Sequence, residues 1–152
     1  MTKILASLAL AAPLCALAQP LAYQRSGDLA WVCGGVGSEE RHALDAMRPE
    51  ARLELLLVTA PRGAYVAGAQ VSVAPARGGT PVTLDAEGPT CLLQAPPGRY
   101  RIEASYNGTT RSATANVARA GKPARVVLAF PNEEREDIRA TEEEKREAAA
   151  PD

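Results

Sequence analysis

Histidine and aromatic residues are scarce in this sequence, whose 152 residues include one histidine, one tryptophan, one phenylalanine and four tyrosines. Hydrolytic and metal-dependent enzymes usually take their general base or their metal ligands from histidine. The one histidine, His42, is expected on the surface of a short helix, with Asp45 three residues on. Aromatic residues are not interleaved with the basic ones, as base stacking on single-stranded nucleic acid requires. We therefore expect no enzyme, no metal site, no cofactor and no nucleic-acid partner.

Long hydrophobic runs are also lacking after residue 20. The earlier run, residues 4–18, is shorter than the roughly 20 residues that a bilayer needs. It follows a single positive charge at Lys3 and ends in Ala-Leu-Ala, a small-x-small pattern typical of signal cleavage. We expect residues 1–18 to be a secretory signal cut between Ala18 and Gln19, with a membrane anchor as the alternative. The mature chain would then be periplasmic or secreted and would keep no membrane span.

Cysteine is scarce too, and of the three cysteines Cys15 would leave with the signal. Cys33 and Cys91 remain, an even pair in an oxidising compartment, which makes them a disulfide candidate. Cys91 alternates with Leu93 and Ala95, which indicates a buried position. A bridge would close a long loop and stabilise the fold by roughly 4 kcal/mol in the chain-entropy model. The alternative is a pair of small buried thiols.

Charge divides the expected mature chain into a body and a tail. Residues 132–152 hold nine acidic and four basic residues, whereas residues 19–131 hold nine acidic and twelve basic. The tail has one large apolar residue, Ile138, and Glu-to-Arg spacings such as Glu142–Arg146 that favour a helix. We expect a solvated tail, disordered or partly helical, with docking to a basic partner as the alternative.

Strand patterns dominate the body. Residues 99–106 and 109–117 each alternate apolar and polar side chains, and Asn107-Gly108 between them favours a type I′ hairpin turn. Further strands are expected at residues 52–60, 69–74, 81–85, 90–95 and 124–130, separated by segments rich in proline and glycine. About seven short strands with regular turn signals predict an all-β fold, an antiparallel sandwich of Greek-key type over residues 52–131.

Two stretches of the body, VAGAQVSV at residues 66–73 and PPGRYRIEASYNG at residues 96–108, resemble a secreted carboxypeptidase regulatory-like domain. The resemblance covers roughly residues 53–130 and implies a transthyretin-like β-sandwich. It implies no particular activity, since such domains serve many proteins. With its GGVGSEE segment, the chain is similar to small exported proteobacterial proteins that carry only this domain. It departs from that family at Cys33, where a small residue such as serine is usual, and at Cys91, where an apolar one is usual.

A glycine-rich loop at residues 34–38 has the composition of a phosphate-binding loop but not its pattern. A P-loop needs a lysine after its last glycine, and Glu39 and Glu40 would repel a phosphate. We expect these glycines to lead into a short helix over residues 39–47, so that residues 19–51 form a segment ahead of the sandwich. The alternative is a small-ligand or anion site, or an enzyme, that uses this loop with His42. The loop residues are Gly34, Gly35, Gly37 and Ser38, the last expected to cap the helix.

The function expected from these features is that of a non-catalytic interaction module of the cell envelope, which binds a protein or a surface polymer. Sandwich domains often bind through their loops and exposed faces. The expected surface is the outward side of the hairpin over residues 99–117, with Arg99, Arg101 and Arg111. The alternative is that these arginines form an ordinary solvated face.

Overall fold

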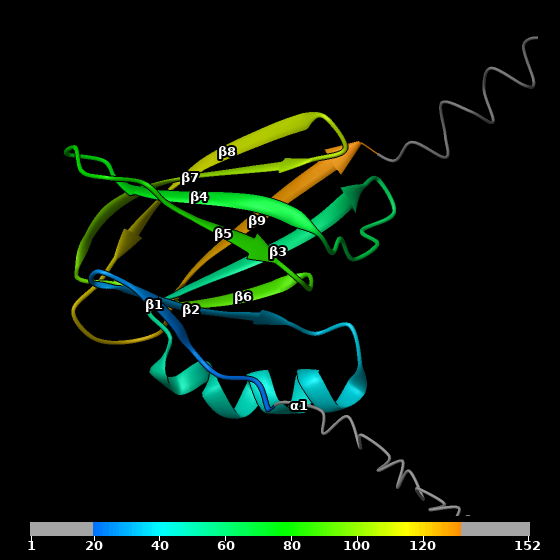
Figure 1. Ribbon diagram of the computed structural model, residues 1–152, viewed down its shortest axis with the longest axis horizontal. Helices are drawn as coiled ribbons and strands as arrows, with labels where there is room; N and C mark the ends of the chain where they lie inside the picture. Colours follow the sequence, from blue (N-terminus) through cyan, green and yellow to red (C-terminus); the bar gives the residue numbers. More distant parts are fainter. Residues whose placement is uncertain (1–19, 132–152) are drawn as a thin grey trace, which may run out of the picture.

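Two β-sheets pack face to face in this computed structural model, which describes residues 20–131 (Figure 1). The five-stranded sheet has the order β1 (Gln24–Ser26), β2 (Leu29–Gly34), β6 (Thr90–Gln94), β3 (Leu53–Ala60), β9 (Ala124–Pro131). The four-stranded sheet has the order β5 (Val82–Ala86), β4 (Ala69–Pro75), β7 (Gly98–Tyr106), β8 (Thr109–Val117). Neighbouring strands are antiparallel except β3 and β9, which run parallel. The predicted all-β sandwich is confirmed, with nine strands where about seven were expected.

Period-two alternation builds the core between the sheets. In β9, Val126, Leu128 and Phe130 are buried and the residues between them are exposed. The ring of Phe130 meets that of Tyr106 from β7 edge to face, with centroids 5.6 Å apart. Such a pair contributes about 0.5–1.5 kcal/mol beyond its buried area, and here it joins the two sheets.

The β7–β8 hairpin turns at Asn107 and Gly108, as the sequence predicts. Both residues have positive φ, 45° and 75°, which the two central positions of a type I′ turn require. The turn fixes the pairing of β7 with β8, in which Tyr106 lies opposite Thr109.

The N-terminal segment differs from its expected placement ahead of the sandwich. β2 pairs with β6 inside the five-stranded sheet, and β1 pairs with β2 at its edge. All six residues of β2 are buried, because one side of the strand faces the core and the other faces a helix. A strand covered on both sides shows no alternation of polar and apolar residues, so the sequence pattern did not predict β2.

Helix α1 (Ser38–Met47) and the 3₁₀ turn η1 (Arg48–Glu50) cover the outer face of β2 and β6. Leu44, the one fully buried residue of α1, packs there against Val32 of β2 and Leu92 of β6, together with Ala51. The helix does not extend over β3 and β9, where the outward residues Val127 and Ala129 remain exposed.

Cys33 and Cys91 form a disulfide between β2 and β6. The two residues are paired directly across the strands and are 58 positions apart in the sequence. The predicted pairing is confirmed, and a disulfide is compatible with an exported protein. The predicted signal with its cleavage between Ala18 and Gln19, and the charged tail at residues 132–152, lie outside the described residues.

Candidate functional site

The glycine-rich loop binds a carboxylate of its own chain. The backbone N–H groups of Gly35 and Val36 donate to Oε2 of Glu40 at 3.0 and 3.1 Å. Gly35 has a φ of 100°, a left-handed conformation that glycine adopts without steric cost. The two N–H groups that an anion would need are thus engaged by Glu40. This arrangement does not favour a phosphate site at the loop.

The start of α1 also differs from the expected cap. The N-cap position is Gly37, which has no side chain, and Ser38 is the first helical residue. Glu40, in the first turn of α1, accepts from the N–H groups of Gly35 and Val36. Both residues precede the N-cap, so this contact ties the loop to the helix but does not cap it. Arg41 closes the loop from the other side, because its guanidinium donates to the carbonyl oxygens of Gly35 and Val36 at 3.4 and 3.1 Å. Gly34 ends β2 and is buried, whereas His42 is exposed on α1.

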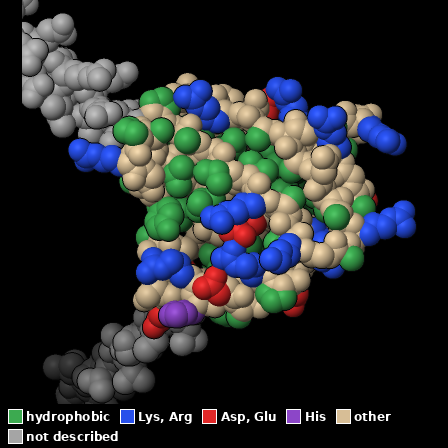
Figure 2. All heavy atoms as spheres, turned by 180° about the vertical axis from the view of Figure 1, so that it is seen from behind, with side chains coloured by type: hydrophobic (Ala, Val, Ile, Leu, Met, Phe, Trp, Pro, Cys, Tyr) green, Lys and Arg blue, Asp and Glu red, His purple; other side chains and the backbone are tan. Residues whose placement is uncertain are grey.

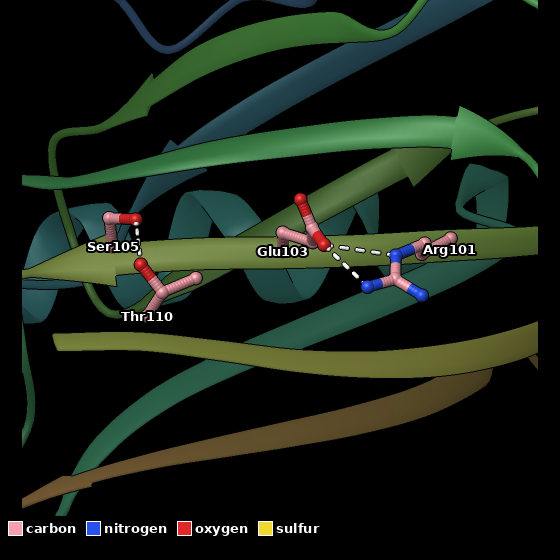
Figure 3. Close-up of polar contacts among 4 residues, drawn as sticks. All are labelled: Arg101, Glu103, Ser105 and Thr110. Carbon is pink, nitrogen blue, oxygen red and sulfur yellow. Dashed lines mark hydrogen bonds and ion pairs between the residues drawn. The ribbon is translucent and has the colours of Figure 1, made fainter.

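The arginines of the hairpin do not form one cationic surface. Arg101 donates twice to Oε1 of Glu103 on the same strand, at 2.9 and 2.7 Å (Figure 3). Beside them, the hydroxyl groups of Ser105 and Thr110 lie 2.7 Å apart in a hydrogen bond across β7 and β8. Arg99 is exposed at the start of β7, but Glu103 offsets the charge of Arg101 at the centre of this face.

Arg111 is not on the outward side of the hairpin, where the sequence analysis placed it. It pairs with Ala104, a buried residue of the inner face, and directly opposed residues of an antiparallel pair point to the same side. At the open edge of the sandwich, its Nε donates to the carbonyl oxygen of Ala129 in β9 at 3.0 Å. Arg111 therefore connects the edges of the two sheets.

The uncovered outer face of β3 and β9 is the most distinctive surface of the described residues, and we call it the β3–β9 face. Figure 2 shows a field of hydrophobic side chains bordered by basic ones. Val127 is 52% exposed and Tyr65 is 66% exposed, two of the three exposed large hydrophobic residues in residues 20–131. Tyr65 comes from the β3–β4 connection, which folds back to form a bridge with Val58 of β3. The residues of its apolar part are Leu56, Val58, Tyr65, Val127 and Ala129.

Basic residues border this apolar part on the side of α1. A hollow of about 160 Å³ joins Leu56 and Tyr65 to Arg41, Arg48 and Arg125. A second, shallower hollow of about 650 Å³ continues from Arg48 and Arg125 to Lys122 in the β8–β9 connection. The four cations of this border are Arg41, Arg48, Lys122 and Arg125.

Two carboxylates offset part of that positive charge. Glu54 of β3 is 7% exposed and forms an ion pair with Arg48. The same guanidinium is 2.8 Å from Oδ1 of Asp45. The hydrogen bond to Glu54, followed by that to Asp45, raises the pKa of Arg48. Arg125, next to Glu54 in the parallel register of β3 and β9, has no ion pair within the described residues, so the border carries excess positive charge.

This face was not expected from the sequence, although one signal of it is present. Residues 124–131, ARVVLAFP, carry apolar side chains at Val127 and Ala129, on the side opposite the core. When one face of a sheet is exposed to solvent, an edge strand is expected to carry polar side chains on that face. Apolar residues on both faces of such a strand were therefore the signal in the sequence for an exposed apolar surface.

Within residues 20–131 there is no group of three or more His, Cys, Asp and Glu side chains that could hold a metal ion. The same part of the chain contains no helix with the length and apolarity to cross a bilayer. Comparison with protein-family models, with curated proteins and with solved structures found no match to this chain.

Proposed function

We propose that this protein is a non-catalytic β-sandwich module of the cell envelope, and that it binds an acidic segment of another protein through the β3–β9 face. The observation that carries the proposal is the exposure of Val127 and Tyr65 beside a surplus of arginine and lysine. Exposed apolar side chains gathered in one patch mark an interaction site more often than scattered ones do.

The chemistry of the face favours a protein over a surface polymer. Val127 and Leu56 are aliphatic, and the apolar side chains of a protein segment pack against such residues better than the hydroxyl groups of a polysaccharide do. The cations around them add complementarity to carboxylates, which speeds association and excludes basic partners. The partner is thus expected to present apolar side chains flanked by aspartate or glutamate.

Export is part of the same proposal. Residues 1–18 have the pattern of a cleaved signal, and the Cys33–Cys91 disulfide is the kind of bond that persists in an oxidising compartment. We place the protein in the periplasm or outside the cell on these grounds. The resemblance of residues 53–130 to carboxypeptidase regulatory-like domains selects no particular role, since such domains serve many proteins, so the binding role rests on the exposed face.

The test is a crosslinking capture from the native envelope, followed by affinity measurements with the purified partner. The test variant reverses two border charges, Arg125→Glu with Lys122→Glu, and a second variant, Val127→Ser, removes apolar contact. The matched control is Arg99→Glu with Arg101→Glu on the other sheet. We expect both face variants to weaken binding at least about tenfold, that is by about 1.4 kcal/mol, and the control to bind normally.

Two outcomes would overturn the proposal. The first is a partner that binds the charge-reversed variant and Val127→Ser as tightly as it binds the unaltered chain. The second is a partner that is lost when the chain is truncated after Pro131 but is unaffected by the face variants, because the function would then lie in residues 132–152. A circular dichroism melt of each variant establishes that a loss of binding is not a loss of folding.

A further inference from the structure

A cleft of about 440 Å³ is lined by residues of the β1–β2 turn, the β4–β5 loop and the β6–β7 connection. These three connections lie at the left end of the sandwich in Figure 1. The floor of the cleft is formed by Leu29 of β2, Val73 of β4 and Val82 of β5, so it reaches the core between the two sheets. The volume lies within the roughly 300–1,000 Å³ of small-ligand sites. None of its lining residues belongs to the β3–β9 face.

Prolines restrict the backbone in the walls of the cleft. Three prolines line it, Pro75, Pro81 and Pro96, one at each of three strand ends or connections. Because the ring of proline fixes φ, these walls lose little freedom when a ligand binds, which favours affinity. The cleft is thus largely pre-formed and apolar.

Tyr100 and Asp28 are the ionisable residues that line the cleft. The hydroxyl of Tyr100 donates to the carbonyl oxygen of Pro96 at 2.8 Å, so the ring is held in place as part of the wall. Asp28 lies in the β1–β2 turn, which Ser26 and Leu29 close by pairing with each other. Gly27 before it has a φ of 58°, the conformation that a type II′ turn requires at this position.

The carboxylate of Asp28 is available to a ligand. No ion pair joins it to a lysine or arginine within residues 20–131. Asp28 and Tyr100 both line the cleft, and burial, followed by the negative charge of Asp28, raises the pKa of Tyr100. An uncompensated carboxylate at the mouth of an apolar cleft attracts a cation that also carries an apolar stem.

We propose that this cleft binds a primary ammonium group on an aliphatic stem, as in a lysine side chain. Asp28 pairs with the ammonium, the three prolines and Tyr100 enclose the methylene groups, and the floor of Leu29, Val73 and Val82 limits their depth. Tyr100 adds a ring face, to which cations are also attracted. Arg77 and Arg99 line the neighbouring hollow, which shares Pro75 and Tyr100 with the cleft. They repel a cation on that side and so direct the ammonium toward Asp28.

The test is a nuclear magnetic resonance titration of the isotope-labelled mature chain with Nα-acetyl-lysine methylamide. The control probe is Nα-acetyl-norleucine methylamide, which has a similar stem and no charge. We expect saturable shifts at the amides of Gly27, Asp28 and Val82, and an affinity for the lysine probe about fivefold higher than for the norleucine probe. That ratio corresponds to a partly exposed ion pair.

Asp28→Asn is expected to lower the affinity for the lysine probe about fivefold and to leave that for the norleucine probe unchanged. The matched control is Asp85→Asn, which removes an exposed carboxylate from the outward side of β5 and should change neither affinity. The proposal is overturned if neither probe shifts the cleft amides in a saturable way. It is also overturned if the two probes bind equally, or if Asp28→Asn binds the lysine probe as the unaltered chain does.

Discussion

The carboxylate of Glu40 lies within hydrogen-bonding distance of the backbone nitrogen atoms of both Gly35 and Val36, at 3.0 and 3.1 Å. A loop whose glycine content is typical of anion binding is therefore closed by the chain's own anion. The loop is thereby tied to the first turn of α1, whose N-cap residue, Gly37, has no side chain to cap the helix.

Glu40→Ala is expected to destabilise the fold by about 1–2 kcal/mol, because two N–H groups lose a charged acceptor. Glu39→Ala is the matched control: it removes the same charge from the same helical turn, but no hydrogen bond of Glu39 is found within the described residues. Urea unfolding followed by circular dichroism measures both. The unaltered chain should show no thermal shift with phosphate, and a shift that His42→Ala abolishes would contradict this account of the loop.

Removing the Cys33–Cys91 disulfide is expected to lower the free energy of unfolding by roughly 4 kcal/mol, because a long loop of the unfolded chain is released. The measurement is urea unfolding of the double variant Cys33→Ser with Cys91→Ser, and of the unaltered chain with and without reductant. The double variant and the reduced unaltered chain should lose a similar free energy of unfolding relative to the oxidised unaltered chain. Two thiols that react with an alkylating agent in the unfolded, unreduced chain would show that the bond does not form.

Gly88 lies against the backbone of Gly34 in β2, and this contact leaves no space for a side chain. A Cβ at position 88 would lie 2.3 Å from both the carbonyl carbon and the oxygen of Gly34, so Gly88→Ala should cost at least about 1–3 kcal/mol through overpacking. Gly37→Ser serves as the control, since a Cβ there meets nothing within 4 Å and a serine would supply the missing cap. The control should be neutral or slightly stabilising in thermal melts, and equal losses for the two variants would refute the close contact.

Alkaline pH is expected to destabilise the protein through Tyr100 and Tyr23. Burial raises the pKa of both phenols above the ordinary value of 10.0, helped by Asp28 at Tyr100 and by Glu50 at Tyr23. Below that value the two phenols are neutral in both the folded and the unfolded chain, so their ionisation does not change the free energy of unfolding. Above it the unfolded chain releases protons first, so the free energy of unfolding falls as the pH rises toward the folded-state pKa.

Titration of tyrosinate absorbance measures the pKa values of the two phenols. Urea unfolding across the same pH range measures the fall in the free energy of unfolding. Asp28→Asn should lower the pKa of Tyr100 while leaving that of Tyr23 unchanged. A stability that rises with pH above 10.0 would show that the sign of this linkage is wrong.

Much of the sandwich could be predicted because its strands alternate. β7 and β9 bury alternate residues along most of their length, and β8 does so at Ala115 and Val117. The pattern of the sequence already contains that information. When the same alternation is extended along β8 toward the turn, it places Arg111 on the side of Ala113 and Ala115, which is the inner face. The expected placement of Arg111 with Arg99 and Arg101 on the outward side of the hairpin is therefore wrong.

β2 and the β3–β9 face depend on contacts that local patterns do not encode. β2 is covered on both sides, so its residues are uniformly apolar and give no period. The β3–β9 face arises because β9 pairs in parallel with β3, a strand more than sixty residues earlier in the sequence, and because α1 stops short of both. Long-range pairing of this kind follows from the packing of whole sheets.

The most direct test of the central claim is site-specific photo-crosslinking in the intact envelope. A photoreactive amino acid at position 127, in place of the exposed Val127, is compared with one in place of Thr114, which is exposed on the outer side of the other sheet. We predict a discrete adduct with one acidic protein from position 127, weakened by Arg125→Glu, and none from position 114. No adduct from position 127, or the same adduct from both positions, would contradict the assignment of the β3–β9 face as the binding surface.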